Sequence, residues 1–299
     1  MDGILNVYKE KGFTSHDVVA KLRGILKMRR IGHTGTLDPD AEGVLPVCLG
    51  KATKLCELLT DKEKAYRAVM KLGVVTDTQD MGGAVLEENP VAVTEEEVLA
   101  AIHSFVGEYD QIPPMYSALK VNGKKLYELA RAGQVIEREA RRIQIISIKV
   151  DEINLPFVTM TVACSKGTYI RTLCHDIGQK LGCGAAMEKL LRVKSGQFYL
   201  EDSLTLSEIS RRMEENSLEA CVIRPDSLFA QYPALTVRAS GEKLLYNGNP
   251  MPLDMLDGIE RLPENGAMVR IYDMKSEFIG IYCFQAERQW YKPKTLFLG

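Results

Sequence analysis

Alternating apolar and polar positions predict several strands. Residues 64–75 alternate in this way, and residues 143–150 and 158–165 follow one another closely enough to be neighbouring members of a sheet. A short apolar segment predicts a strand over residues 3–8, and two more are expected near the C-terminus, over residues 268–274 and 278–284. These runs favour a mixed, mainly antiparallel sheet with helices packed on it.

Apolar residues at helical intervals follow capping signals in two places. Thr14 and Asp17 have the spacing of a capping box, which predicts a helix of about three turns that ends in the basic residues 27–30. Thr94 and Glu97 repeat the signal before a second helix. Further helices are expected over residues 126–132, 170–181 and 207–215. Residues 31–50 predict a glycine-rich loop followed by a short apolar strand or turn.

The length and composition indicate an ordered chain of two domains. The chain has 299 residues, 45% of them hydrophobic and 26% charged, which excludes wholesale disorder. Composition changes over residues 224–234, which contain two prolines, so we expect a larger domain over residues 1–230 and a small β-rich domain over residues 231–299.

Charge is unevenly distributed, although the formal net charge is only −2. Residues 1–30 have a net charge of +4 and residues 113–149 of +5, whereas residues 76–110 contain nine acidic residues and no lysine or arginine. Ordinary solvated faces are one interpretation of such runs. The alternative is two basic surfaces that hold a polyanion, with an acidic surface that repels it elsewhere.

Several kinds of site and location are excluded or disfavoured by the sequence. Seven cysteines without a C-x-x-C pair favour reduced thiols in the cytosol, and the four histidines lack zinc-site spacing. No apolar run approaches membrane-spanning length, and residues 1–12 lack the apolar region of a secretory signal. Six residues lie between Gly43 and Gly50, where a phosphate-binding P-loop needs four, and Ala52 follows Lys51, so a P-loop is excluded.

The segment Gly32-His33-Thr34-Gly35-Thr36-Leu37-Asp38-Pro39 is the most informative in the chain. Its glycines allow tight turns and close approach of a ligand, and Pro39 restricts Asp38 to an extended conformation. Taken alone, an Asp-Pro pair is ordinarily a turn with a capping carboxylate.

This segment and those after it resemble the TruB family of tRNA pseudouridine synthases. GHTGTLDPDAEGVLP resembles the catalytic motif of the family. Four further segments match in the family order: residues 64–80, 113–133, 165–178 and 190–198. Residues 231–299 resemble, more weakly, a PUA-type RNA-binding domain. One departure is Glu10, which follows Lys9 where the family usually has proline, and it puts the local loop geometry in question.

The resemblance implies a fold, a reaction and a partner. It implies an α+β pseudouridine synthase fold with a catalytic cleft and an RNA-gripping insertion over residues 113–142. The reaction converts uridine 55 in the T-loop of tRNA from an N-glycoside to a C-glycoside. No cofactor and no metal is expected. The chain is expected to act on tRNA as a cytoplasmic monomer that does not bind a membrane.

The resemblance also implies roles for particular side chains. Asp38 would be the catalytic carboxylate, either adding to C1′ of the ribose or removing a proton from C2′, and Arg171 would be its charged partner. Without the motif, Arg171 would be an ordinary arginine at the start of a helix. The target base would be flipped out of the folded loop. Tyr66 would be a further catalytic residue, stacked on the uracil with its hydroxyl near the ribose as an acid or base. The other side chains expected around the base are Tyr169 on the pocket floor, Leu191 as an apolar wall, and His33, filling the space left by the base.

For several of these residues, an ordinary structural role is an alternative interpretation. Tyr66, Tyr169 and Leu191 suit core packing equally, and His33 suits a turn in which it bonds to the backbone. Phosphate contacts are expected from two sets of basic residues: Lys9, Lys21, Arg29 and Arg30, and Lys120, Lys124, Lys125, Arg141 and Arg142. Two other functions stay open, a guide-RNA-dependent pseudouridine synthase and a non-catalytic RNA-binding or RNA-folding protein. The electrically neutral residues 235–299 disfavour the first.

Overall fold

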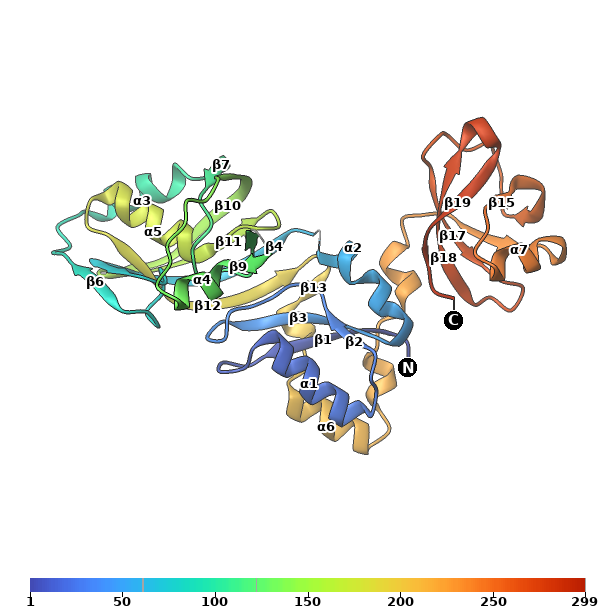
Figure 1. The fold of residues 1–299 in the computed structure, drawn as a ribbon, viewed down its shortest axis with the longest axis horizontal. Helices are drawn as coiled ribbons and strands as arrows, with labels where there is room; N and C mark the ends of the chain where they lie inside the picture. Colours follow the sequence, from blue (N-terminus) through green and yellow to red (C-terminus); the bar gives the residue numbers. More distant parts are fainter. Residues whose placement is uncertain (61, 122, 299) are drawn as a thin grey trace.

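The computed structural model describes residues 1–60, 62–121 and 123–298, and a nine-stranded sheet forms its centre (Figure 1). The strand order is β1-β3-β12-β4-β11-β10-β7, with β2 paired to β3 and β13 paired to β12. All pairs are antiparallel except β3 with β12, so the expected mixed, mainly antiparallel sheet is confirmed. The strands are β1 (Gly3–Lys9), β2 (Ile31–His33), β3 (Glu42–Leu49), β4 (Lys64–Leu72), β7 (Gly107–Gln111), β10 (Arg141–Asn154), β11 (Phe157–Cys164), β12 (Ala185–Ser195) and β13 (Phe198–Tyr199).

Helices pack on this sheet at two separate places. Toward β7, α3 (Glu95–His103) and α5 (Ile170–Leu181) bury apolar side chains with strands β4, β10 and β11. Toward β1, α1 (Ser15–Leu26) and α6 (Leu206–Glu214) share a second core with β1 and β3. Figure 1 shows the two helix pairs at different ends of the sheet. The sheet therefore joins two apolar cores, and the strands between them run past both.

The predicted capping boxes are present and fix where two helices begin. The Thr14 side chain accepts from the backbone N–H of Asp17, and the Thr94 side chain accepts from that of Glu97. The first helix ends at Leu26, and Lys27 has a left-handed backbone, so the basic residues 27–30 follow the helix. Gly182 ends α5 in the same left-handed conformation, as its position in the sequence predicts.

Residues 31–50 are more regular than predicted. The short strand β2 comes first, and β3 is an eight-residue strand with seven buried positions. Leu45, Val47 and Leu49 on one face of β3 and Val44 and Cys48 on the other lie in two different apolar cores, so an apolar run without alternation is the pattern that this location requires. The loop between β2 and β3 contains Asp38.

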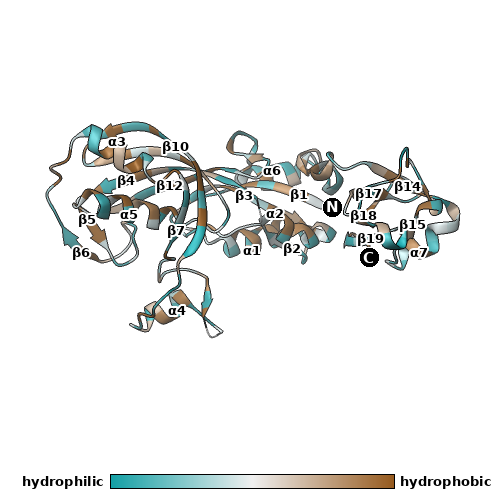
Figure 2. Ribbon diagram, turned by 90° about the horizontal axis from the view of Figure 1, so that it is seen from above, coloured by the Kyte–Doolittle hydropathy of each residue, from teal (hydrophilic) through white to brown (hydrophobic). Residues whose placement is uncertain are grey.

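The 113–142 segment stands away from the sheet around α4 (Leu126–Arg131) (Figure 2). Its short strands β8 (Lys120–Val121) and β9 (Lys124–Lys125) pair with each other. Asn122 and Gly123 separate them in the sequence, an Asn-Gly pair that predicts a tight turn, and Asn122 lies outside the described residues. A further small sheet pairs β5 (Val74–Thr76) with β6 (Val85–Glu88), and α2 (Cys56–Thr60) follows β3.

The end of the chain forms a six-stranded sheet in the order β15-β19-β18-β17-β14-β16. The strands expected near the C-terminus are β17 (Met268–Tyr272) and β18 (Phe278–Gln285). Ile281 and Phe297 belong to the same apolar core as Leu55 and Phe229, so this sheet packs directly against the first part of the chain. The remaining elements are β14 (Ala234–Val237), α7 (Glu242–Tyr246), β15 (Met251–Pro252), β16 (Leu256–Asp257) and β19 (Trp290–Leu296).

Two structural findings concern the expectations of reduced cysteines and of a chain without a membrane-spanning segment. All seven cysteines have free thiols. Among the described residues, no helix has both the length and the apolar character needed to cross a bilayer.

Candidate active site

The loop that contains Asp38 is held to the rest of the molecule by its main chain. The Thr34 N–H donates to the Pro46 carbonyl at 3.1 Å, and the Leu37 N–H donates to the Ser15 hydroxyl at 2.9 Å. The Leu37 side chain is buried in the core between α5 and the sheet. Asp38 therefore directly follows a fixed residue, Leu37, rather than standing on a free loop tip.

Asp38 and Arg171 form an ion pair across 133 residues of sequence. The Arg171 Nε lies 3.0 Å from one carboxylate oxygen of Asp38, and Nη2 lies 3.3 Å from the other. Arg171 is the second residue of α5 and is only 5% exposed. Its guanidinium also donates to the Thr78 carbonyl at 3.1 Å and to the Tyr116 carbonyl at 2.8 Å, so its orientation is fixed before any ligand binds.

A second carboxylate, which the sequence did not single out, lies on the other side of Arg171. The Arg171 Nη1 is 3.4 Å from Asp80 Oδ2. Asp80 follows β5, and its carboxylate also accepts from the Thr78 hydroxyl at 2.7 Å. Neither its spacing nor its neighbours in the sequence mark it, because the contact depends on how the loop after β5 meets α5.

The ionisation of Asp38 reflects its surroundings. Burial raises the pKa of the Asp38 carboxyl, the Arg171 guanidinium lowers it, and the Asp80 carboxylate raises it again. The side chain nevertheless keeps 41% of its surface exposed, so it is open to a ligand while Arg171 behind it is not. The result is an accessible carboxylate with a pKa above its ordinary value and a fixed guanidinium as counter-charge.

Tyr66 and Tyr169 lie close to this pair. Tyr66 is on β4 and 8% exposed; burial raises the pKa of its hydroxyl, and the neighbouring Arg192 guanidinium lowers it. Tyr169 precedes α5, where its backbone N–H and carbonyl are both bonded to the Gln111 side-chain amide. Tyr66 shares an apolar core with Leu37, the residue before Asp38, and Tyr169 is two residues before Arg171, so both come from segments next to the ion pair.

The site residues and the fold identify the family. Residues 23–170 match the N-terminal domain of the TruB family pseudouridylate synthases, and residues 171–229 match the C-terminal domain of tRNA pseudouridylate synthase B. The chain is 51% identical, over all of its length and all of the relative's, to a protein from Lachnoclostridium phytofermentans named tRNA pseudouridine synthase B. The chain belongs to the TruB family.

Other comparisons agree with this membership of the TruB family. A protein of the same name from Clostridium acetobutylicum is 48% identical, over 94% of this chain and 95% of its own. A solved structure of a Cbf5-Nop10-Gar1 complex is similar in fold, with a TM-score of 0.74 and 27% identity over 99% of this chain and 85% of that one. Another, of an H/ACA RNP bound to a substrate RNA containing 2′-deoxyuridine, has a TM-score of 0.72 and 25% identity over 99% and 85% of the two chains.

Lys9 is not a surface cation, and its predicted contact with RNA phosphate is wrong. The side chain is fully buried, and its ammonium donates to the carbonyls of Glu10 at 3.1 Å, Pro39 at 3.0 Å and Ala41 at 2.6 Å. Burial lowers the pKa of Lys9 to about 8. In this TruB-family chain Lys9 therefore fastens the loop on the far side of Asp38. The Glu10 main-chain carbonyl is one of these acceptors, and a proline at this position would supply the same carbonyl.

The prediction for Leu191 is also wrong, by one residue. Leu191 is paired with Arg67 across β12 and β4, whereas Leu190 is paired with Ala68 and Arg192 with Tyr66. Directly paired residues of antiparallel strands point to the same face, so Leu191 faces away from Tyr66. Leu190 shares the core that contains Leu37 and Tyr66 and is the leucine on the Tyr66 side.

His33 lies at the end of β2 and is half-buried. Its Nδ1 accepts from the Gly35 N–H at 3.4 Å, a turn contact that the sequence left open beside stacking on RNA. Burial lowers the pKa of His33, and the Arg192 charge lowers it further, so the ring is kept neutral near pH 7. A neutral ring is the form suited to stacking, which stays a prediction.

Of the other basic residues predicted to contact RNA, some have a side-chain partner within the protein and others are exposed. Arg142 pairs with Glu108 at 3.0 Å and Asp110 at 2.7 Å, and Lys125 donates to the Tyr127 hydroxyl at 3.2 Å. Arg30 donates to the Thr53 hydroxyl. The remaining five are all exposed: Lys21, Arg29, Lys120, Lys124 and Arg141.

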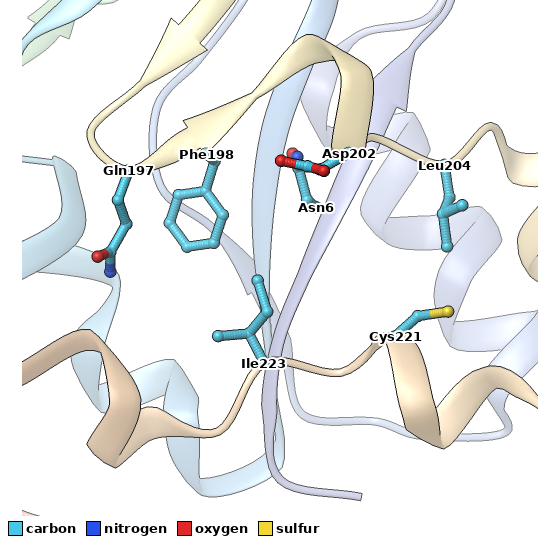
Figure 3. Close-up of a pocket in the computed structure, with 7 residues that line it drawn as sticks. All are labelled: Asn6, Gln197, Phe198, Asp202, Leu204, Cys221 and Ile223. Atoms are coloured by element: carbon cyan, nitrogen blue, oxygen red, sulfur yellow. The ribbon is translucent and has the colours of Figure 1, made fainter. Parts of the chain in front are cut away.

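Two cavities among the described residues have linings that do not include Asp38. One of about 310 Å³ opens between β1, β13 and the segment after α6, and Figure 3 shows its lining residues Asn6, Gln197, Phe198, Asp202, Leu204, Cys221 and Ile223. A second, of about 270 Å³, includes Gln79 and Thr172, the sequence neighbours of Asp80 and Arg171. A deep cleft at Asp38 itself stays a prediction. Within the described ranges, no cluster of three or more His, Cys, Asp or Glu side chains is arranged to hold a metal.

Proposed function

We propose that this chain isomerises uridine 55 in the T-loop of tRNA to pseudouridine and that Asp38 is the residue that attacks the ribose. The observation that carries this proposal is the Asp38–Arg171 ion pair at 3.0 Å in a TruB-family chain. The 51% identical relative that spans the whole chain is named tRNA pseudouridine synthase B, which supports tRNA as the substrate.

The reaction needs a carboxylate that is ionised, accessible and fixed in direction. The N1–C1′ bond must break, the free uracil must turn, and a new bond must form from C5. Asp38 either adds to C1′ as a nucleophile or removes a proton from C2′, and both routes use its ionised form. Arg171 holds the carboxylate through two of its nitrogens and is itself held by two carbonyls, so the geometry exists before substrate binds.

The neighbouring side chains would hold the detached base. We assign Tyr66 to stacking on the uracil and Tyr169 to the pocket floor, because both share the electrostatic environment of Asp38. We assign the apolar wall of the pocket to Leu190 instead of Leu191, because Leu190 lies on the Tyr66 face of β12. His33 would occupy the space that the flipped base leaves in the T-loop.

RNA binding would come from the exposed basic residues and from the small C-terminal sheet. We propose that Lys21, Arg29, Lys120, Lys124 and Arg141 contact phosphates and that residues 231–299 form a PUA-type RNA-binding domain. We further propose that the chain acts alone in the cytoplasm, where its seven free thiols would stay reduced.

The test is Asp38→Asn, with Asp40→Asn as the matched control from the exposed part of the same loop. Product is measured as tritium released from C5 of labelled uridine in a tRNA transcript, and binding by filter retention. Asp38→Asn should bind tRNA as the wild type does and lose at least about 100-fold in rate. Asp40→Asn should stay close to the wild type.

The same assay separates the other functions. Isomerisation by the purified chain on a bare transcript excludes a need for guide RNA and protein partners. Asp38→Asn that still forms pseudouridine at the wild-type rate would show that the catalytic assignment is wrong. A chain that binds tRNA but releases no tritium would be an RNA-binding or RNA-folding protein.

A further inference from the structure

Arg192 is a fully buried arginine beside the candidate active site whose charge the proposed mechanism does not use. It lies on β12 and is 1% exposed. None of the ion pairs among the described residues includes it. A buried guanidinium without a carboxylate is costly, so its hydrogen bonds show what it holds in place.

Those hydrogen bonds reach the loop that carries Asp38. The Arg192 Nη2 donates to the Gly35 carbonyl at 3.2 Å, and Nε donates to the Val44 carbonyl at 2.6 Å. Gly35 has a φ of +147°, which favours glycine, and lies three residues before Asp38. One guanidinium thus ties the turn at the start of the loop to the strand that follows it.

The same guanidinium reaches Tyr66. Arg192 and Tyr66 are directly paired across β12 and β4 and their side chains point to the same face, and the Arg192 guanidinium lowers the pKa of the Tyr66 hydroxyl. The backbone at Arg192 is also fixed, because Gly43 packs so closely on it that a Cβ there would lie 2.3 Å from the Arg192 carbonyl oxygen. This close packing fixes the backbone from which the Arg192 side chain extends.

The position of the guanidinium beside Tyr66 matters for the chemistry. A guanidinium has donors and no acceptor, so a phenol oxygen that faces it can only accept from it, and the phenolic hydrogen is left to point toward another group. Its positive charge also favours the ionised form of the phenol, so Arg192 lowers the pKa of Tyr66 against the larger effect of burial, which raises it. Arg192 therefore influences both the direction and the acidity of the Tyr66 hydroxyl.

We propose that Arg192 is a positioning residue for the isomerisation, which fixes the Gly35 turn of the Asp38 loop and the Tyr66 hydroxyl in a single arrangement. This inference rests on the proposed function, since it assigns a role within that reaction. Arg192 acts through Gly35 and Tyr66, and contact with the reacting atoms is not required of it.

The test compares Arg192→Met, Arg192→Lys and Arg67→Met. Arg67 lies on β4, faces solvent on the opposite side of the same strand pair, and controls for the loss of one positive charge. Under single-turnover conditions Arg192→Met should slow pseudouridine formation by about 100-fold and leave the Kd for tRNA within roughly twofold. Arg192→Lys should recover part of the loss, and Arg67→Met should match the wild type.

Two readouts distinguish positioning from simple stability. The alkaline limb of the pH–rate profile should move to higher pH in Arg192→Met, because the phenol loses the charge that favours its ionisation. In a Tyr66→Phe background, Arg192→Lys should cost much less than it does in the wild type, because the hydroxyl it serves is gone. Urea unfolding of each variant reports its stability, and Arg192→Lys serves if Arg192→Met does not fold.

The outcomes separate this inference from the proposed function. Wild type and Arg67→Met that form no pseudouridine would overturn the proposed function. If they do form it, rates within threefold of wild type for both Arg192 variants would overturn the inference. Equal losses in the presence and absence of the Tyr66 hydroxyl, with an unmoved pH profile, would overturn it as well.

Discussion

At the scale of single residues, the candidate site depends on how three charged groups share one region. The Arg171 guanidinium lies between Asp38 and Asp80, at 3.0 Å and 3.4 Å. Burial raises the pKa of Asp38 and the guanidinium opposes this, while Asp80 works against the guanidinium. The charge of Asp80 therefore makes Asp38 a weaker acid.

Replacement of Asp80 should be visible in the pH dependence of the rate. The reactive form of Asp38 is the carboxylate, so the rate falls as pH drops through its pKa. Asp80→Asn removes a like charge, lowers the pKa of Asp38 and should move the acid limb of the single-turnover profile to lower pH. Asp77→Asn, from the exposed part of the same loop, should leave the limb in place. An acid limb that moves upward in Asp80→Asn would contradict this account.

How much of the site could be predicted also depends on single residues. The Asp38–Arg171 pair followed from the ordered motifs, because spacing alone does not bring together residues 133 positions apart. Lys9 was misplaced because counting charges does not show which ammonium is buried. Leu191 was misplaced because a shift of one residue along a strand reverses the face. Asp80 had no local signal at all.

At the scale of elements, the position of Arg171 depends on how closely α5 packs on β12. Gly178 makes this contact: a Cβ there would lie 2.1 Å from the Ala185 backbone nitrogen. The strands, the capping boxes and the end of α5 could be predicted from local pattern. The close approach of helix and strand could not, because glycine at that position has no meaning until the two elements meet.

Two glycine substitutions in helices should have opposite effects on stability. Gly178→Ala should lower the free energy of unfolding by about 2 kcal/mol, since the backbone clash outweighs the helix propensity that alanine gains. It should also slow the reaction, because α5 carries Arg171. Gly24→Ala, in α1 with nothing within 4 Å, should raise the free energy of unfolding by about 0.5–1 kcal/mol. Urea unfolding measures both, and equal effects would contradict the packing argument.

At the scale of the whole molecule, the charge distribution and the shared core determine how RNA meets the site. The insertion with its exposed lysines stands away from the sheet in Figure 2. The C-terminal sheet shares an apolar core with the first part of the chain, so the two parts pack directly on one another. The two-part organisation was visible in the sequence, but this shared core was not, because its residues come from distant segments.

The affinity for tRNA should fall steeply as salt rises, since phosphate contacts release counterions. Lys124→Ala should weaken binding and reduce the slope of log K against log salt by about one unit. Arg142→Ala should change the slope less, because Arg142 is already paired with Glu108 and Asp110. Filter binding over a salt series measures both variants. Affinity that stays nearly constant up to physiological salt would rule out the basic surfaces as the RNA-binding sites.

The burial of Lys9 has a consequence for chemical reactivity. An amine with a pKa of about 8 has a sizeable neutral fraction at neutral pH and is therefore a good nucleophile toward acylating and aldehyde reagents. The carbonyls of Pro39 and Ala41 cover it, so such electrophiles reach it only when the segment carrying Asp38 opens. The segment that presents the carboxylate thereby also shields a reactive amine from covalent damage.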